Sequence, residues 1–123
     1  MTEPEEGASD PTCVFCAIVH GERAARVVGK NAHALAFYDL NPVAPSHVLI
    51  VPRRHIEHFG DLREHHGEIL VAMVALTQEV ARHEGLEARG YRVVANVGAD
   101  AGNSVPHLHL HLLGGRRLAW PPG

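Results

Sequence analysis

The feature that most constrains the fold of this chain is a run over 107–112 in which histidine and leucine alternate without interruption. Such alternation predicts a half-buried strand, because successive side chains on a strand point to opposite faces of the sheet. One face would carry the leucines (Leu108, Leu110 and Leu112) and the other the histidines (His107, His109 and His111). Alternate residues on one face lie roughly 6.5 Å apart, so the sequence predicts three imidazoles in a row.

The row of imidazoles predicts reactive chemistry. Neighbouring imidazoles cannot all be protonated without repulsion, so their titrations should be coupled and spread apart. Neutral and charged rings would then coexist near neutral pH, which suits nucleophilic and acid–base catalysis. A surface strand whose polar face happens to be histidine is the plainer alternative. A metal site built from all three is disfavoured, because successive positions on one face of a strand diverge.

Length and charge place the chain among globular proteins of one domain. Its 123 residues can bury a core without disulfide staples, and its net charge of −3 gives no basic surface for nucleic acid. No apolar run approaches the ~18 residues of a membrane span, and residues 1–11 lack the apolar core of a signal peptide. We therefore expect a cytoplasmic protein with a disordered tail over 1–11 and one domain over 12–123, without nucleic-acid or membrane partners.

The predicted secondary structure is a set of short elements around one long helix. Residue patterns predict, in chain order, a short helix capped by Thr12, three strands, a long helix ended by Gly85 and two further strands. Their expected ranges are 13–20, 26–29, 32–38, 47–51, 67–83, 91–96 and 107–113. The long helix should bury Ile69, Leu70, Met73, Val74, Thr77 and Val80. This order predicts an α+β domain with an antiparallel sheet of about five strands.

Two loops carry candidate ligand-binding groups. Residues 98–104 form the loop before the histidines. Its glycines allow backbone N–H groups to turn towards a bound anion, and the side chains of Asn103 and Ser104 offer further hydrogen-bond donors. Asp39 is either a solvated turn residue or a carboxylate that binds the hydroxyls of a ribose. Four apolar residues would serve equally as a slot for a base or as plain core: Phe15, Ile18, Phe37 and Leu40.

Cys13 and Cys16 form a C-x-x-C pair and are the only cysteines in the sequence. In a reducing compartment this spacing indicates metal binding or redox chemistry more often than a structural disulfide. Two ordinary reduced thiols are the plainer alternative. Six other histidines stand in polar contexts and are interpreted as solvated surface residues: His20, His33, His58, His65, His66 and His83.

The run over 107–113 resembles the H-φ-H-φ-H-φ-φ signature (φ, apolar) of the histidine triad superfamily. Three further stretches, 37–42, 44–55 and 113–123, resemble its Hint branch, the nucleoside phosphoramidases, and the last of them ends in Trp-Pro-Pro-Gly. The resemblance extends from about Cys13 to the C-terminus. It implies the fold of that superfamily, with a sheet that continues across a homodimer.

The resemblance also implies a reaction and a set of catalytic residues. His109 would attack the α-phosphorus of a nucleoside 5′-phosphoramidate and form a nucleotidyl-histidine intermediate, which water then hydrolyses. His111 would stabilise the developing charge of the phosphate. His47 and His107 would orient His109, and Ser104 would lie near the phosphate and the leaving amine.

The same resemblance implies a site for a purine nucleoside monophosphate or its amine conjugates. Asp39 would bind the ribose, Asn96 the nucleotide, and Gly102 and Asn103 the phosphate. The base pocket would be formed by Phe15, Ile18, Phe37 and Leu40. Trp120, in the C-terminal tail, would reach the active site of the partner in the homodimer.

The C-x-x-C pair departs from the best-known Hint proteins and resembles the N-terminus of other bacterial histidine triad proteins, which hold zinc. The resemblance implies a zinc site made of Cys13, Cys16, His55 and His107. Two thiolates and two imidazoles suit a closed, structural tetrahedral site. The reaction itself would require no metal or other cofactor.

Four functions therefore remain to be distinguished, one of which is a zinc-dependent structural module. The leading hypothesis is a hydrolase that acts on P–N bonds of AMP– or GMP–amine conjugates. A dinucleoside polyphosphate hydrolase would use the same covalent histidine with a different leaving group. A nucleotide-binding scaffold protein would have no turnover at all.

Overall fold

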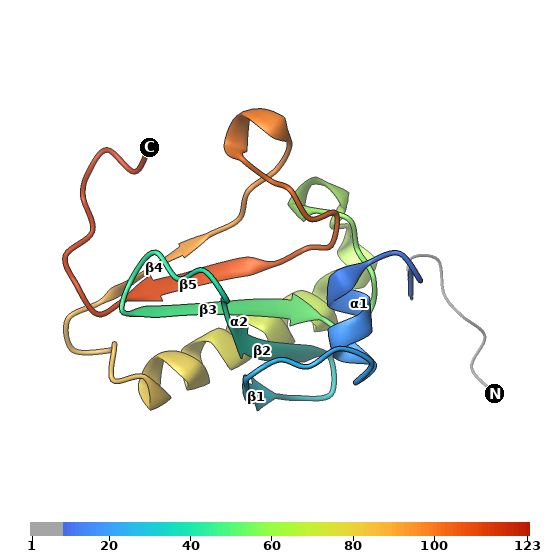
Figure 1. Ribbon diagram of the computed structural model, residues 1–123, viewed down its shortest axis with the longest axis horizontal. Helices are drawn as coiled ribbons and strands as arrows, with labels where there is room; N and C mark the ends of the chain where they lie inside the picture. Colours follow the sequence, from blue (N-terminus) through green and yellow to red (C-terminus); the bar gives the residue numbers. More distant parts are fainter. Residues whose placement is uncertain (1–8) are drawn as a thin grey trace.

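A computed structural model describes residues 9–123 as one five-stranded antiparallel sheet with a helix on each face (Figure 1). The strand order is β1-β2-β3-β5-β4. The elements are α1 (Val14–Val19), β1 (Val27–Lys30), β2 (Ala34–Tyr38), β3 (Ser46–Pro52), α2 (Gly67–His83), β4 (Tyr91–Val94) and β5 (Leu110–Gly114). The α+β class and the sheet predicted from the sequence are thereby confirmed.

The long helix α2 has the predicted bounds, but its buried face differs from the prediction. It buries Met73, Leu76, Thr77, Val80 and Ala81. Leu70 and Val74 were expected in the core, yet they are 36% and 45% exposed. Val74 follows Met73 directly and is therefore rotated about 100° away from the buried stripe. The buried stripe of α2 packs mainly on β1, β2 and β3.

A half-buried carboxylate, that of Glu84, anchors the C-terminal end of α2 to the sheet. Glu84 accepts hydrogen bonds from Tyr38 Oη (2.6 Å) and Ser46 Oγ (2.7 Å), which belong to β2 and β3. Burial opposes ionisation of Glu84, but these bonds outweigh it and lower its pKa. The helix then ends as predicted at Gly85, whose φ of +72° is readily adopted by glycine.

The histidine–leucine run is a strand only in its second half. Leu108, Leu110 and Leu112 are buried on the α2 side, so the predicted alternation is confirmed. However, β5 begins at Leu110, three residues later than predicted. Before it, His107 N–H donates to Val105 O (2.9 Å) and Leu108 N–H donates to Ile56 O (2.6 Å). The backbone here is bonded to a loop rather than to a neighbouring strand.

The register of the sheet places the reactive side chains on the face that α1 partly covers. His111 on β5 is paired with Leu49 on β3 and with Val94 on β4. Directly paired residues share a face, and His47, two residues before Leu49, therefore shares it as well. A second apolar cluster, which includes Phe15 and Leu49, lies on this face beneath α1.

The N-terminal region differs from the prediction at the first helix cap. Cys13, not Thr12, caps α1, and its Sγ accepts the Cys16 N–H at 3.3 Å. Thr12 instead donates to Asp10 Oδ1 through its N–H (2.8 Å) and its hydroxyl (2.7 Å). Residues 1–8 of the predicted disordered tail lie outside the described residues. Within 9–123, no helix is long and apolar enough to cross a membrane.

Candidate active site and metal centre

A hydrogen bond to the backbone carbonyl of His107 fixes the tautomer of His109. Its Nδ1 lies 2.7 Å from the carbonyl oxygen of His107. A carbonyl oxygen can only accept a hydrogen bond, so Nδ1 carries a proton, and in the neutral ring Nε2 has the lone pair. The edge of the Phe15 ring packs against the imidazole at a centroid distance of 5.2 Å. The arrangement leaves His109 Nε2 as a nucleophilic nitrogen.

His111 is oriented through His47. The Val43 N–H donates to His47 Nδ1 (3.1 Å), so the proton of neutral His47 resides on Nε2. This Nε2–H then donates to His111 Nδ1 at 2.9 Å. The proton of neutral His111 is therefore on Nε2. In their neutral forms, His109 thus presents a lone pair on Nε2 and His111 presents an N–H donor on Nε2.

Both rings of this pair are neutral near pH 7. Burial, together with the neighbouring His109 and His47, lowers the pKa of His111 to about 4. Burial also lowers the pKa of His47, although Asp39 Oδ2 lies 3.4 Å from its Nε2 and favours the charged form. The contact between Asp39 and His47 is therefore a charge–dipole contact rather than a salt bridge.

Of the two residues expected to orient His109, only His107 contacts it in that way. The ring of His47 hydrogen-bonds to His111, not to His109. His107 orients His109 through its backbone carbonyl, whereas its imidazole points elsewhere. The alternation of the sequence gives the face of each ring but not its hydrogen-bond partner.

The His107 imidazole is fully buried beside the two cysteines. Its Nε2–H donates to the Pro52 carbonyl at 2.9 Å, so the lone pair of the neutral ring is on Nδ1. This Nδ1 lies 3.2 Å from Cys13 Sγ and 3.5 Å from Cys16 Sγ. Burial lowers the pKa of His107 to about 4, so the ring is neutral and able to act as a ligand.

His55 completes a group of four donor atoms that lie within 4.8 Å of one another. Its Nδ1 is 3.3 Å from Cys16 Sγ and 3.2 Å from His107 Nδ1. In tetrahedral zinc sites two ligand nitrogens lie about 3.3 Å apart, and a nitrogen and a sulfur about 3.6 Å apart. Burial raises the pKa of the Cys16 thiol to about 11, so a bound cation would displace its proton. The four side chains fit a structural zinc ion.

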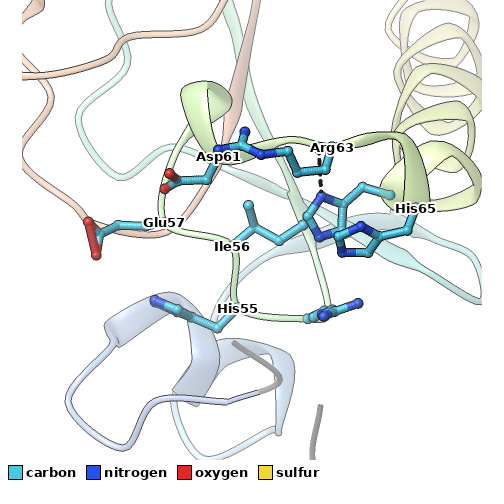
Figure 2. A pocket seen from close by; sticks show the side chains of 8 residues that line it. His55, Ile56, Glu57, Asp61, Arg63 and His65 are labelled. Atoms are coloured by element: carbon cyan, nitrogen blue, oxygen red, sulfur yellow. Dashed lines mark hydrogen bonds between the residues drawn. The ribbon is translucent and has the colours of Figure 1, made fainter. Parts of the chain in front are cut away.

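The four ligands differ in their access to solvent. Cys13, Cys16 and His107 are buried, whereas His55 is half-buried. Figure 2 shows His55 on the wall of a separate cavity of about 430 Å³ that Glu57 and His65 also line.

His66, on the same cavity, corrects the expectation that it is a solvated surface residue. It is only 7% exposed, and its Nδ1 accepts the Arg63 N–H at 2.9 Å, the bond drawn in Figure 2. Its polar sequence context did not reveal that the turn before α2 folds over it.

A second cavity, of about 310 Å³, brings together most of the predicted nucleotide-binding residues. Six of these residues line it: Phe15, Ile18, Phe37, Leu40, Asp39 and Ser104. Leu40 is 84% exposed and lies at the surface, while Phe15 and Phe37 are buried with rings 5.5 Å apart. The cavity combines an apolar wall with a carboxylate and a hydroxyl.

Four other predicted residues do not line this cavity. Asn96 follows β4, and Gly102 has a φ of +79° in the loop before the histidines. Asn103 Oδ1 accepts the Val105 N–H at 3.3 Å, which closes that loop. Trp120 is 80% exposed.

Eight other lining residues were not predicted from the sequence, and Asn41 and Arg23 are two of them. Asn41 lies close to Asp39, since its N–H donates to Asp39 Oδ1 at 2.7 Å, and the Asp-Leu-Asn-Pro turn could have indicated this contact. Arg23, in the connection between α1 and β1, carried no such signal.

Comparison with known proteins agrees with this geometry. The family model of the HIT domain matches residues 20–118. A 14 kDa zinc-binding protein from Zea mays is 43% identical over 129 residues, covering 100% of both chains. A HIT family hydrolase from Legionella pneumophila superposes with a TM-score of 0.88 at 45% identity, covering 91% of this chain and 100% of that one. A histidine triad nucleotide-binding protein from Candida albicans gives a TM-score of 0.77 at 27% identity, covering 89% and 83%. This chain belongs to the HIT family.

Proposed function

We propose that this protein hydrolyses nucleoside 5′-phosphoramidates through a covalent nucleotidyl intermediate on His109. The observation that carries the proposal is the tautomer of His109, whose Nδ1–H is held by the His107 carbonyl while Nε2 keeps its lone pair. The nitrogen of the P–N bond takes up a proton from solvent, and Nε2 attacks the α-phosphorus. The P–N bond breaks, its electron pair stays on the nitrogen, and the neutral amine leaves. Water then attacks the phosphorus and restores His109.

The neighbouring donors suit the charges of this reaction. The Nε2–H of His111, fixed through His47, stabilises the negative charge that develops on the phosphate oxygens. The hydroxyl of Ser104 hydrogen-bonds to the leaving amine. A P–N bond becomes labile once its nitrogen is protonated, so a neutral nucleophile beside proton donors is the useful combination.

The cavity beside the histidines accepts the nucleoside. Asp39 binds the ribose hydroxyls, and its carboxylate is already fixed by the Asn41 N–H at 2.7 Å. Phe15, Ile18, Phe37 and Leu40 form the base pocket, since all four line the cavity. Asn96, Gly102 and Asn103 contact the nucleotide after it binds.

A zinc ion would be held by Cys13, Cys16, His55 and His107, as the name of the maize relative suggests. When bound, it supplies a cross-link between distant segments of the chain. The residues themselves join α1 to the segment before β5. Because the His107 carbonyl orients His109, holding His107 in the metal site also positions the nucleophile. Unpaired cysteines agree with a reducing compartment such as the cytoplasm.

The protein acts as a homodimer in which the sheet continues across β4. This strand is at an edge of the sheet, and Val93 pairs with Leu112 and so shares the α2 side. Val93 is 45% exposed, as is Val74 on the uncovered flank of α2. Apolar surface beside a free strand edge favours association. In the dimer, Trp120 reaches the active site of the partner.

A comparison of substrates tests the proposed reaction. We expect a larger kcat/KM for adenosine 5′-phosphoramidate than for a diadenosine polyphosphate. The reverse order would identify a polyphosphate hydrolase. Nucleotide binding without turnover of either compound would identify a scaffold protein.

A further inference from the structure

The wall of the nucleoside cavity includes one cationic side chain, that of Arg23, which the proposed reaction does not use. Asp39 is assigned to the ribose and Ser104 to the leaving amine, and the Asn41 N–H fixes the Asp39 carboxylate. Tyr38 also lines the cavity, but its hydroxyl is committed to Glu84 at 2.6 Å. The remaining lining side chains are apolar, except for that of Arg23.

Arg23 is positioned to meet a ligand rather than a protein group. It is exposed, and its backbone N–H is bonded to the Ala17 carbonyl at 3.3 Å, which fixes the connection to α1. Within residues 9–123, its guanidinium has no ion pair or hydrogen bond. Arg23 therefore lines the cavity with a charged side chain that has no hydrogen-bond or ion-pair partner among residues 9–123.

The chemistry of this group distinguishes the two purines. A guanidinium offers five N–H donors in a planar fork and no acceptor. Guanine presents two adjacent acceptors, O6 and N7, which a guanidinium binds together. Adenine presents N7 beside the N6 amino group, which is itself a donor and opposes the guanidinium. We propose that Arg23 makes this site selective for 6-oxopurine nucleotides, an inference that rests on the proposed nucleotide chemistry.

Three substrates and three variants test this selectivity. We expect kcat/KM for guanosine 5′-phosphoramidate to exceed that for the adenosine compound about tenfold, the value of one bidentate contact. The inosine compound, which keeps O6 and N7 but lacks the 2-amino group, should behave like guanosine. Arg23→Met should bring the ratio of kcat/KM for the guanosine compound to that for the adenosine compound close to one. Arg23→Lys should give an intermediate ratio. Arg82→Met, which removes an exposed arginine that does not line the cavity, is the matched control.

Several outcomes would overturn the proposal. They are a wild-type ratio near one, a preference for adenosine, or a ratio that Arg23→Met leaves unchanged. An equal loss on both substrates would show that Arg23 only stacks on the base. The dissociation constants of GMP and AMP, measured by calorimetry, give the same ratio without turnover. Failure of the proposed hydrolysis would thus abolish turnover while leaving the selectivity measurable.

Discussion

His107 and His109 are two residues apart on the same face, yet their surroundings differ completely. His107 is fully buried, and both of its nitrogens are directed at protein groups, the Pro52 carbonyl and the cysteine sulfurs. His109 is only partly buried and has one nitrogen bonded, with the other left as a lone pair. The strand pattern therefore determines the face, whereas contacts from distant segments determine whether a ring binds metal or reacts.

The proposed function gives the motif a metal-binding half and a reactive half. The metal-binding half comprises His107 with Cys13, Cys16 and His55, and the reactive half comprises His109 and His111 with His47. Changes in the first half should act mainly on stability, and changes in the second mainly on turnover. The following predictions test this division in order of decreasing effect.

Replacing the nucleophile should have the largest effect. His109→Asn removes the lone pair that attacks phosphorus, so kcat should fall about ten-thousandfold. The melting temperature and the calorimetric affinity for GMP should change little, because the ring does not bind the metal. His33→Asn, at an exposed histidine, is the control. Substantial residual turnover with His109→Asn would place the reactive group elsewhere.

Disrupting the zinc ligands should lower stability most. Cys16→Ser should abolish bound zinc in elemental analysis and lower the free energy of unfolding by about 4 kcal/mol at a zinc concentration a thousand times the dissociation constant. Ala17→Ser, a hydroxyl added at the next position of α1, is the matched control. If Cys16→Ser left the zinc content and stability unchanged, the metal-binding half would lose its support.

Removing His47 should impair catalysis without affecting the metal. His47→Ala deletes the donor that holds His111 Nδ1 at 2.9 Å, so the Nε2–H of His111 loses its orientation. We expect kcat to fall about a hundredfold with little change in KM. Zinc content should stay at the wild-type value. A larger effect on zinc than on kcat would contradict the division into two halves.

The smallest effect concerns pH. The pKa of His111 is lowered from 6.5 to about 4 in the folded protein. The unfolded chain therefore binds more protons between these values, so stability falls as the pH is lowered from 6.5 to 4 and levels off below. Because the ring is half-buried, its contribution should be about 1–2 kcal/mol. The difference in unfolding free energy between wild type and His111→Gln should follow this course, and His33→Gln should show none of it.

Local patterns predicted much of the fold. The bounds of α2, its end at Gly85 and the alternation of leucines were all predicted, because each depends on residues close in sequence. The buried face of α2 was only partly predicted, because it depends on which strands the helix covers. Leu76 lies in the core and Val74 does not, although both are apolar.

The contacts within the site were harder to predict. The C-x-x-C spacing suggested a metal site, but the placement of Cys16 beside His55, 39 residues away, depends on the whole fold. Hydrogen bonds between the histidine rings and backbone groups could not be predicted from the sequence. The Val43 N–H and the Pro52 carbonyl determine the tautomers of His47 and His107. Every residue type has a backbone carbonyl, and every type except proline has an N–H, so the sequence does not mark these contacts.

The most direct test of the account is to trap the covalent intermediate. The protein would be mixed with guanosine 5′-phosphoramidate, stopped within one turnover in alkaline denaturant, digested and analysed by mass spectrometry. We predict a guanylyl group on the peptide that contains His109, attached at Nε2 and formed at least as fast as product. Product release while His109 stays unmodified, or an adduct on another residue, would contradict the central claim.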